Sequence, residues 1–162
     1  MAFVIPILAL AAAQTRPAGD AACLVSPLNG QVLEDRVDWL GSPNAVEVQN
    51  GSRGNAIVKI REASTGRLLV TVFVLKNATA RYDGIPDGAY TLQYAIGDRL
   101  NPHCTNFPRF DSIGEFPPSE PLIADVSTSG EKHSHTLRYT LFPVPGGNAT
   151  PHAIEVSAFN AP

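Results

Sequence analysis

The chain has 162 residues, of which 44% are hydrophobic and 17% are charged, with 13 glycines and 14 prolines. This length fits one domain that buries its own core, and the shortage of charges beside many turn formers favours short strands over long helices. The formal net charge is −3 and no two Lys or Arg residues are adjacent, so the charge pattern of a nucleic-acid-binding protein is missing. We expect no nucleic-acid partner.

The amino-terminal end has the features of an export signal. Residues 2–13 form an apolar run that is shorter than the roughly 20 residues needed to span a bilayer. The run ends in consecutive alanines, which a signal peptidase accepts, although no basic residue precedes it. We predict a signal peptide over residues 1–13, an N-terminal extension over residues 14–44, and a secreted or periplasmic product without a membrane span. The alternative is that the run forms a buried strand or helix.

Cys23 and Cys104 are the two cysteines of the chain, and their spacing does not indicate zinc or redox chemistry. In an oxidising compartment the two thiols should pair. Closing a loop of this length stabilises a fold by about 4 kcal/mol in the chain-entropy relation. We therefore predict a disulfide that ties the N-terminal extension to the central loop.

Alternation of apolar and polar residues identifies strands in the first half of the domain. We predict strands over residues 45–49, 55–62, 68–75, 78–82 and 89–96. The turn formers Ser64–Arg67 join the second and third of these strands into a hairpin. Because Asp83–Gly88 contains Pro86 between two Asp-Gly pairs, we expect a tight turn that ends strand pairing there.

The regular pattern stops over residues 97–121, where prolines break any strand. It resumes over residues 122–127 and 135–142, which residues 128–131 should join as a hairpin, and residues 153–159 could add an edge strand. The predicted fold is all-β, a single antiparallel β-sandwich of about seven strands over residues 45–159, transthyretin-like or immunoglobulin-like in type.

Alternation also predicts which side chains point between the two sheets. The inward set is Tyr90, Leu92, Tyr94, Ile96, Leu137, Tyr139 and Leu141. Because polar residues alternate with most of these positions, we expect the set to form the core of the sandwich.

The segment Gly84–Leu92 reads Gly-Ile-Pro-Asp-Gly-Ala-Tyr-Thr-Leu. It resembles the turn of PEGA and carboxypeptidase-regulatory-like modules, in which Leu/Ile-Pro-x-Gly-x-Tyr links two strands, with Asp87 in place of the glutamate of Pro-Glu-Gly-Ala. The hairpin over residues 57–66 matches those modules in order and spacing, so the resemblance covers residues 45–97. It implies a transthyretin-like sandwich that serves as an accessory or cell-surface domain. Residues 141–149 also resemble exported bacterial proteins, and neither likeness implies catalytic residues.

His133 and His135 are the most metal-like feature of the sequence. Residues two apart on a strand project from the same face, so two imidazoles could bind zinc or copper there. Two ligands are not enough, and His103 or His152 would have to join them. The alternative is that the two histidines are simply exposed at the start of a strand. Because ligands are missing, we favour this alternative and predict no metal site.

Other chemical motifs are equally sparse. Asp83, Asp87 and Asp98 lie in turn-like sequences, but they do not form a calcium-loop pattern, and a role in turns accounts for them. The sequence has no nucleophile elbow, phosphate-binding loop, dinucleotide-binding glycine set or HExxH motif. We therefore predict no catalytic residues and no cofactor, and a protein that is not an enzyme.

The Pro-rich segment between residues 100 and 116 is the candidate binding region. It carries Phe107, Arg109, Phe110 and Phe116 close to the predicted disulfide, and exposed aromatic rings beside an arginine are typical of binding surfaces. The alternative is that these rings cover one open end of the sandwich.

These observations predict a non-catalytic, exported accessory module that binds a protein or glycan at the cell envelope. A second hypothesis is a structural subunit of a surface layer or filament that self-associates through strand edges. A more distant hypothesis is a metal-dependent enzyme that uses His133 and His135.

Overall fold

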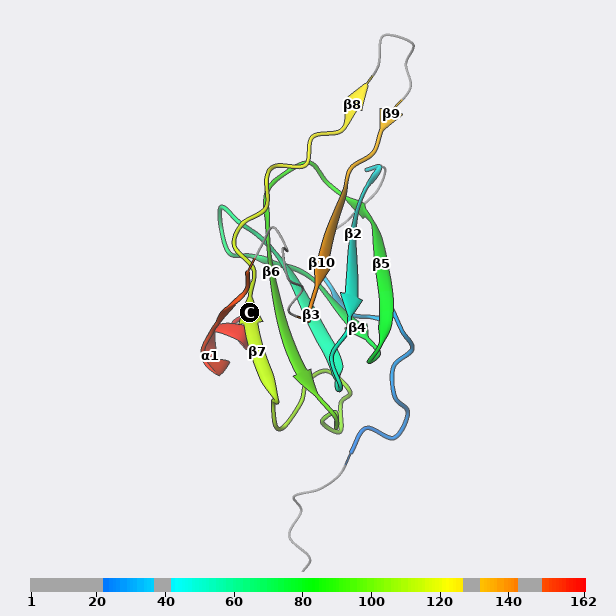
Figure 1. Ribbon diagram of the computed structural model, residues 1–162, viewed down its shortest axis with the longest axis vertical. Coiled ribbons are helices and arrows are strands. Elements are labelled where there is room, and N and C mark those ends of the chain that lie inside the picture. The colour runs from blue at the N-terminus through cyan, green and yellow to red at the C-terminus, as the bar shows by residue number, and fades with distance from the viewer. Residues whose placement is uncertain (1–21, 37–41, 127–131, 143–149) are drawn as a thin grey trace, which may run out of the picture.

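A computed structural model describes the protein over residues 22–36, 42–126, 132–142 and 150–162. The predicted signal peptide, the predicted turn over residues 128–131 and most of the segment 141–149 lie outside these ranges. The remainder folds as an all-β sandwich of two layers (Figure 1).

Among the described residues, the larger sheet has six strands in the order β1-β4-β3-β6-β7-β11, and each neighbouring pair is antiparallel. Its strands are β1 (Val32–Asp35), β4 (Leu68–Val74), β3 (Asn55–Glu62), β6 (Tyr90–Gly97), β7 (Ser112–Glu115) and β11 (His152–Ala153). The predicted hairpin of β3 and β4 is confirmed, with Lys59 opposite Thr71.

The smaller sheet consists of β10 (Thr136–Thr140), β2 (Asn44–Asn50) and β5 (Ala78–Ile85), in that order. β2 is antiparallel to β5 but parallel to β10, so this sheet is mixed. The short strands β8 (Asp125–Val126) and β9 (Lys132–His133) pair with each other and project beyond one end of the sandwich (Figure 1). A helix long and apolar enough to cross a membrane does not occur in the described ranges.

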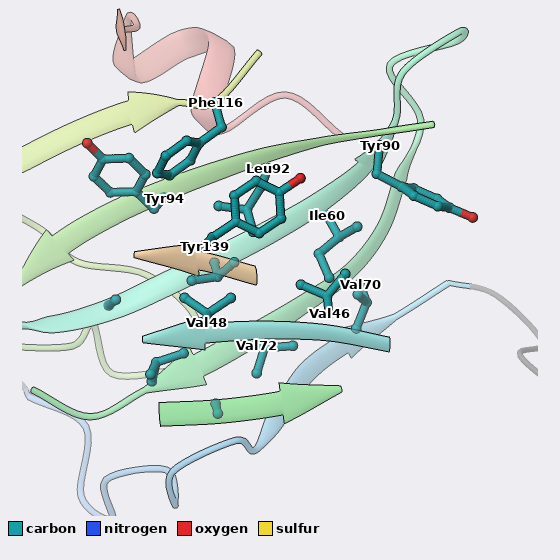
Figure 2. Close-up of a cluster of buried hydrophobic side chains, with 14 of the residues drawn as sticks. Val46, Val48, Ile60, Val70, Val72, Tyr90, Leu92, Tyr94, Phe116 and Tyr139 are labelled. Carbon is teal, nitrogen blue, oxygen red and sulfur yellow. The ribbon is translucent and has the colours of Figure 1, made fainter. Parts of the chain in front are cut away.

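The space between the two sheets is filled by a cluster of apolar side chains (Figure 2). The valines and isoleucines of β2, β3 and β4 supply one part of it, and aromatic rings of β6 and β10 supply another. Of the predicted inward set, Tyr90, Leu92, Tyr94, Ile96, Tyr139 and Leu141 are buried there, and Leu137 packs against the cluster while partly buried. The predicted inward face is therefore confirmed.

A second apolar cluster, here called the outer cluster, covers the opposite face of the larger sheet. Ile57, Phe73 and Ala95 project outward from β3, β4 and β6. They meet Leu100, Phe107 and Phe159, and all six residues are buried. The central strands of the larger sheet are therefore covered on both faces, and all seven residues of β4 are buried.

The strand β7 lies inside the segment for which the sequence predicts no strand. Its centre is Gly114, where a Cβ atom would lie only 2.6 Å from the hydroxyl oxygen of Tyr94. Glycine is therefore required for Tyr94 to lie across β7 on the inner face. The missing side chain also removes the alternation that would have identified β7 as a strand.

The prediction that pairing ends at Asp83 is wrong. β5 continues to Ile85, which lies opposite Asn44, and the register shifts in this last step. The intervening Gly84 has a φ of +89°, in the left-handed region that glycine adopts without steric cost. This irregularity in the hydrogen-bonding pattern lets β5 continue through a turn-like sequence. The strand then ends at Ile85, directly before Pro86.

Residues 122–142 also depart from the predicted hairpin. In the described ranges, pairing between its two halves is limited to β8 and β9, while Leu122 bridges to Gly88. β10 then pairs in parallel with β2 rather than with the preceding strand. Alternation predicts the inward face of β10 correctly, but it carries no information about the direction of the neighbouring strand.

Both flanking segments join the sandwich. β1 lies in the predicted N-terminal extension, yet it pairs with β4 at the edge of the larger sheet. The predicted edge strand over residues 153–159 is restricted to β11, after which the chain forms the single-turn helix α1 (Val156–Phe159). Phe159 is fully buried in the outer cluster, so this turn is fixed by packing rather than by sheet pairing.

Candidate functional site

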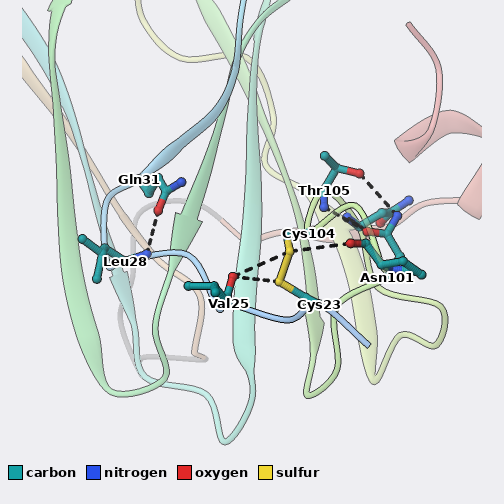
Figure 3. The surroundings of a disulfide bond; sticks show 9 residues. Cys23, Val25, Leu28, Gln31, Asn101, Cys104 and Thr105 are labelled. Carbon is teal, nitrogen blue, oxygen red and sulfur yellow. Dashed lines mark hydrogen bonds between the residues drawn. A yellow bond between two sulfur atoms is a disulfide. The ribbon is translucent and has the colours of Figure 1, made fainter. Parts of the chain in front are cut away.

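The predicted disulfide joins two segments at one end of the sandwich (Figure 3). Cys23 and Cys104 are bonded with their Cα atoms 5.0 Å apart. The loop around Cys104 is ordered by Asn101, whose side-chain oxygen accepts a hydrogen bond from the Thr105 N–H at 3.0 Å. The Asn101 carbonyl accepts another from the Cys104 N–H at 2.9 Å. The disulfide therefore connects the N-terminal segment to an internally hydrogen-bonded loop.

The structure separates the four residues predicted to bind a partner. Phe107 and Phe116 are both buried, with Phe107 in the outer cluster and Phe116 between the two sheets. Phe110 is half-buried, and its ring makes edge contacts with Phe107 and Phe159. Arg109 alone among the four is exposed. A binding role for this loop stays a prediction, while Phe107 and Phe116 contribute to the packing on the two faces of the larger sheet.

Exposed apolar side chains occur instead beside Cys23, where the sequence analysis predicts no site. Leu24 is 98% exposed, Val25 80% and Leu28 76%. We call these three residues the aliphatic patch. The signal in the sequence is weak, because three aliphatic residues near a cysteine resemble an ordinary buried segment.

The backbone that carries the aliphatic patch is held by local contacts, although the three side chains are exposed. The Val25 carbonyl oxygen lies 2.9 Å from the Cys23 sulfur and faces the Cys104 sulfur as well (Figure 3). A disulfide has no S–H group to donate, so this is a close contact rather than a hydrogen bond. The Leu28 N–H donates to the side chain of Gln31 at 2.9 Å. The patch is therefore presented on a braced segment.

A line of polar residues crosses the outer face of the larger sheet. Lys59, Gln93, Glu115 and His152 lie opposite one another on β3, β6, β7 and β11, and we call them the polar row. The Gln93 amide donates to Glu115 at 2.7 Å, and His152 Nε2 lies 3.6 Å from the other Glu115 oxygen. Arg61 joins the row through its Nε, which donates to Gln93 Oε1 at 2.9 Å.

The cations of this region hold the C-terminal segment, defined as residues 150–162. Lys59 Nζ donates to the Phe159 carbonyl at 2.8 Å and lies 4.7 Å from the centre of the Phe159 ring. Arg61 donates to the carbonyl oxygen of Ala161 at 2.6 Å and to that of Pro162 at 3.2 Å. A turn of the chain is thus clamped over the sheet by two cations.

Burial shapes the electrostatics of both cations. Desolvation, with a smaller contribution from Arg61, lowers the pKa of Lys59 to about 8. Desolvation, followed by repulsion from Arg36, also lowers the pKa of Arg61, which nevertheless remains charged. A lysine with a lowered pKa can act as a nucleophile or base. Here the Phe159 carbonyl and ring cover the amine, so the arrangement holds a segment rather than exposing a reactive group.

The outer face of the smaller sheet is polar and open to solvent. Arg138 Nε lies 3.3 Å from Glu47 on the neighbouring strand, and Arg81 Nε lies 2.7 Å from Asp83. Arg81 also donates to the Thr136 hydroxyl at 3.3 Å. Exposed ion pairs of this kind contribute about 0–1 kcal/mol, so they describe a solvated surface rather than a built site.

The predicted metal-like residues do not converge. Across the described ranges, no three His, Cys, Asp or Glu side chains lie close enough together to hold a metal ion. His133 and His135 are exposed, and His152 lies against Glu115 on the larger sheet. Asp87 has a structural task, since its carboxylate accepts hydrogen bonds from Asn44 and from a backbone N–H at 2.9 Å each.

One small cavity lies beside the strands that line the core of the sandwich. It measures about 10 Å³ and is lined mainly by valines of β2, β3 and β4. That volume is at the lower limit for a single water molecule, and apolar walls would keep it dry. This cavity therefore offers no room for a ligand.

Comparison with known proteins adds no relative, because no protein family, curated protein or solved structure gives a match to this chain.

Proposed function

We propose that this protein is an exported, non-catalytic accessory module that binds a partner at the cell envelope through the aliphatic patch. The observation that carries the proposal is the near-complete exposure of Leu24, Val25 and Leu28 on a segment braced by the disulfide. Grouped exposed apolar side chains are characteristic of interaction sites. The resemblance of residues 84–92 to PEGA modules supports an accessory role.

The rigid backbone matters because binding costs free energy when a loop has to be ordered. The bond from Cys23 to Cys104 restricts the segment before any partner arrives. A pre-ordered segment loses less conformational entropy on binding, so more of the hydrophobic gain contributes to affinity. The disulfide also supports export, since such bonds persist in oxidising compartments.

The chemistry of the patch favours a protein partner over a glycan. Its side chains are aliphatic and offer neither hydrogen-bond donors nor acceptors to sugar hydroxyls. A complementary apolar surface on a protein would remove them from water, which yields about 25 cal/mol for each Å² buried.

The test uses the purified mature protein and isolated cell envelopes of the producing organism. Replacing Leu24, Val25 and Leu28 together by Ser should reduce co-sedimentation with envelopes by about tenfold or more, because a combined loss of about 1.4 kcal/mol in binding free energy already lowers the affinity tenfold. The melting temperature should not change, since these side chains are already in water. Ile123→Ser is the matched control, because Ile123 is 60% exposed outside the patch.

Two treatments of the envelopes identify the class of partner. Loss of binding after protease digestion of the envelopes indicates a protein, whereas loss only after removal of glycans indicates a glycan. A triple variant that co-sediments like the unaltered protein would remove the aliphatic patch as the binding surface.

A further inference from the structure

The C-terminal segment is attached to the larger sheet in the manner of a bound peptide. Of its described residues, only Phe159 is buried, and the others are exposed or half-exposed. β11 contributes just two residues to the sheet edge beside β7, and Asn160 adds one side-chain bond to Asn106 at 2.9 Å. A short edge strand with one aromatic anchor is also how extended peptides dock on sheets.

Among the described residues, the cations that hold the segment form no close ion pair with a carboxylate side chain, although the charges of Glu34 and Glu115 act on them. Within the described ranges Lys59 bonds to the Phe159 carbonyl alone, whereas Arg61 also donates to Gln93 and to the Gly66 carbonyl, which lie outside the segment. Docking the segment removes water from both charges, and this desolvation offsets part of the gain from their hydrogen bonds. Undocking would return water to both charges, which lowers the net gain from the docked hydrogen bonds.

Undocking would also leave a site complementary to the segment itself. The pocket for Phe159 is built by Ile57, Phe73 and Phe107, all from other parts of the chain. The edge of β7 would then present unpaired backbone groups, which readily accept a strand from another molecule.

We propose that this face is an exchange site that binds the C-terminal segment of a second copy of the protein. The same contacts would form between molecules as within one, so two copies could swap segments symmetrically. The occupant is identified by fit, because the segment supplies the strand, the ring and the carbonyls that the site accepts. The site shares no residue with the aliphatic patch, so it stands or falls separately from the proposed binding function.

Competition with the molecule's own segment determines how the exchange can be detected. A tethered segment has an effective concentration in the millimolar range, so it excludes an added peptide unless its own docking is weakened. Phe159→Ala in the full-length, disulfide-bonded protein removes the anchor and leaves the pocket intact. A labelled synthetic peptide of residues 150–162 with Phe159 unchanged is then the probe.

Fluorescence anisotropy should show that the peptide binds the Phe159→Ala protein with a Kd about tenfold or more lower than for the unaltered protein. A peptide carrying the same substitution should not bind either protein. Val156→Ala is the matched control, because Val156 is 44% exposed on the same turn. Equal peptide binding by the two proteins overturns the proposal, and so does a Phe159→Ala protein that fails to fold, since exchange requires a folded domain without its docked segment.

Light scattering of the unaltered protein tests the second copy as occupant. We expect a dimer that increases with protein concentration and is lost in the Phe159→Ala variant. A protein that remains monomeric up to the millimolar range would overturn exchange even if the added peptide binds.

Discussion

The outer faces of the two sheets start from the same pleated geometry but differ in what covers them. The smaller sheet exposes Arg81 and Arg138 to water, while the larger sheet buries Phe73 and even the guanidinium of Arg61. The loop around Cys104 and the C-terminal segment cause this difference, because they cover the outer face of the larger sheet and not that of the smaller one. Sequence-distant loops can thus supply a layer that the strands by themselves do not specify.

The largest expected effect comes from removing a side chain of the covered face. Phe73→Ala should lower the free energy of unfolding by about 3–5 kcal/mol, because Phe73 is fully buried in the outer cluster. On the open face, Arg138→Ala should change it by less than about 0.5 kcal/mol. Urea denaturation of the two variants measures both values. Similar costs at the two positions would mean that the faces do not differ as described.

A smaller effect is expected at the margin of the covered face. Phe110 is half-buried, and its ring centre lies 6.5 Å from that of Phe107 and 6.1 Å from that of Phe159. Phe110→Ala should therefore cost about 1–2 kcal/mol and lower the melting temperature by several degrees. Arg109→Ala, next to it and exposed, should leave the melting temperature unchanged. An unchanged melting temperature for Phe110→Ala would instead support a role of that ring in binding.

The smallest effect follows from the lowered pKa of Lys59, which is about 8 in the folded protein and 10.5 in an unfolded chain. Between these values the unfolded state binds more protons than the folded state, so stability should rise with pH from about 8 to 10. We expect about 1 kcal/mol, less than the full shift implies, because the amine is partly hydrated. Burial also raises the pKa of Tyr90 to about 12, which opposes the rise above pH 10.

Lys59→Met isolates this contribution, because it keeps the aliphatic stem and removes the titrating group. Denaturation midpoints measured at pH 7.5, 8.5 and 9.5, values chosen to bracket the pKa of about 8, should rise for the unaltered protein. They should stay level in the variant. A parallel rise in both proteins would assign the pH dependence to other groups.

Much of the sandwich could be predicted from the sequence because period-two alternation determines which side chains face inward. This worked for Leu92 and Tyr139, which are buried between the sheets. The burial of the other face was also visible in principle, since Leu68–Val74 is almost continuously apolar, as strands covered on both sides are. An alternating strand such as β10, by contrast, leaves one face for water.

The remainder could not be predicted because it depends on contacts between distant segments. Nothing local at Arg61 indicates that its partners are Ala161 and Pro162. Likewise, exposure of Leu24 follows from where the disulfide places its segment, and not from its residue type. The even cysteine count predicted the bond itself, but it could not indicate which neighbouring side chains remain outside.

The parallel pairing of β10 with β2 has a consequence for the order in which the fold is completed. The two strands meet across a long stretch of chain, and the His135 N–H reaches the Asn44 side chain over a sequence separation of 91 residues. During synthesis β3 to β7 are therefore available to pair before β10 has been made. Until then, the edge of β2 that pairs with β10 has no partner strand. An unpaired edge that carries buried valines is prone to aggregate, so we expect chaperones to protect β2 until β10 arrives.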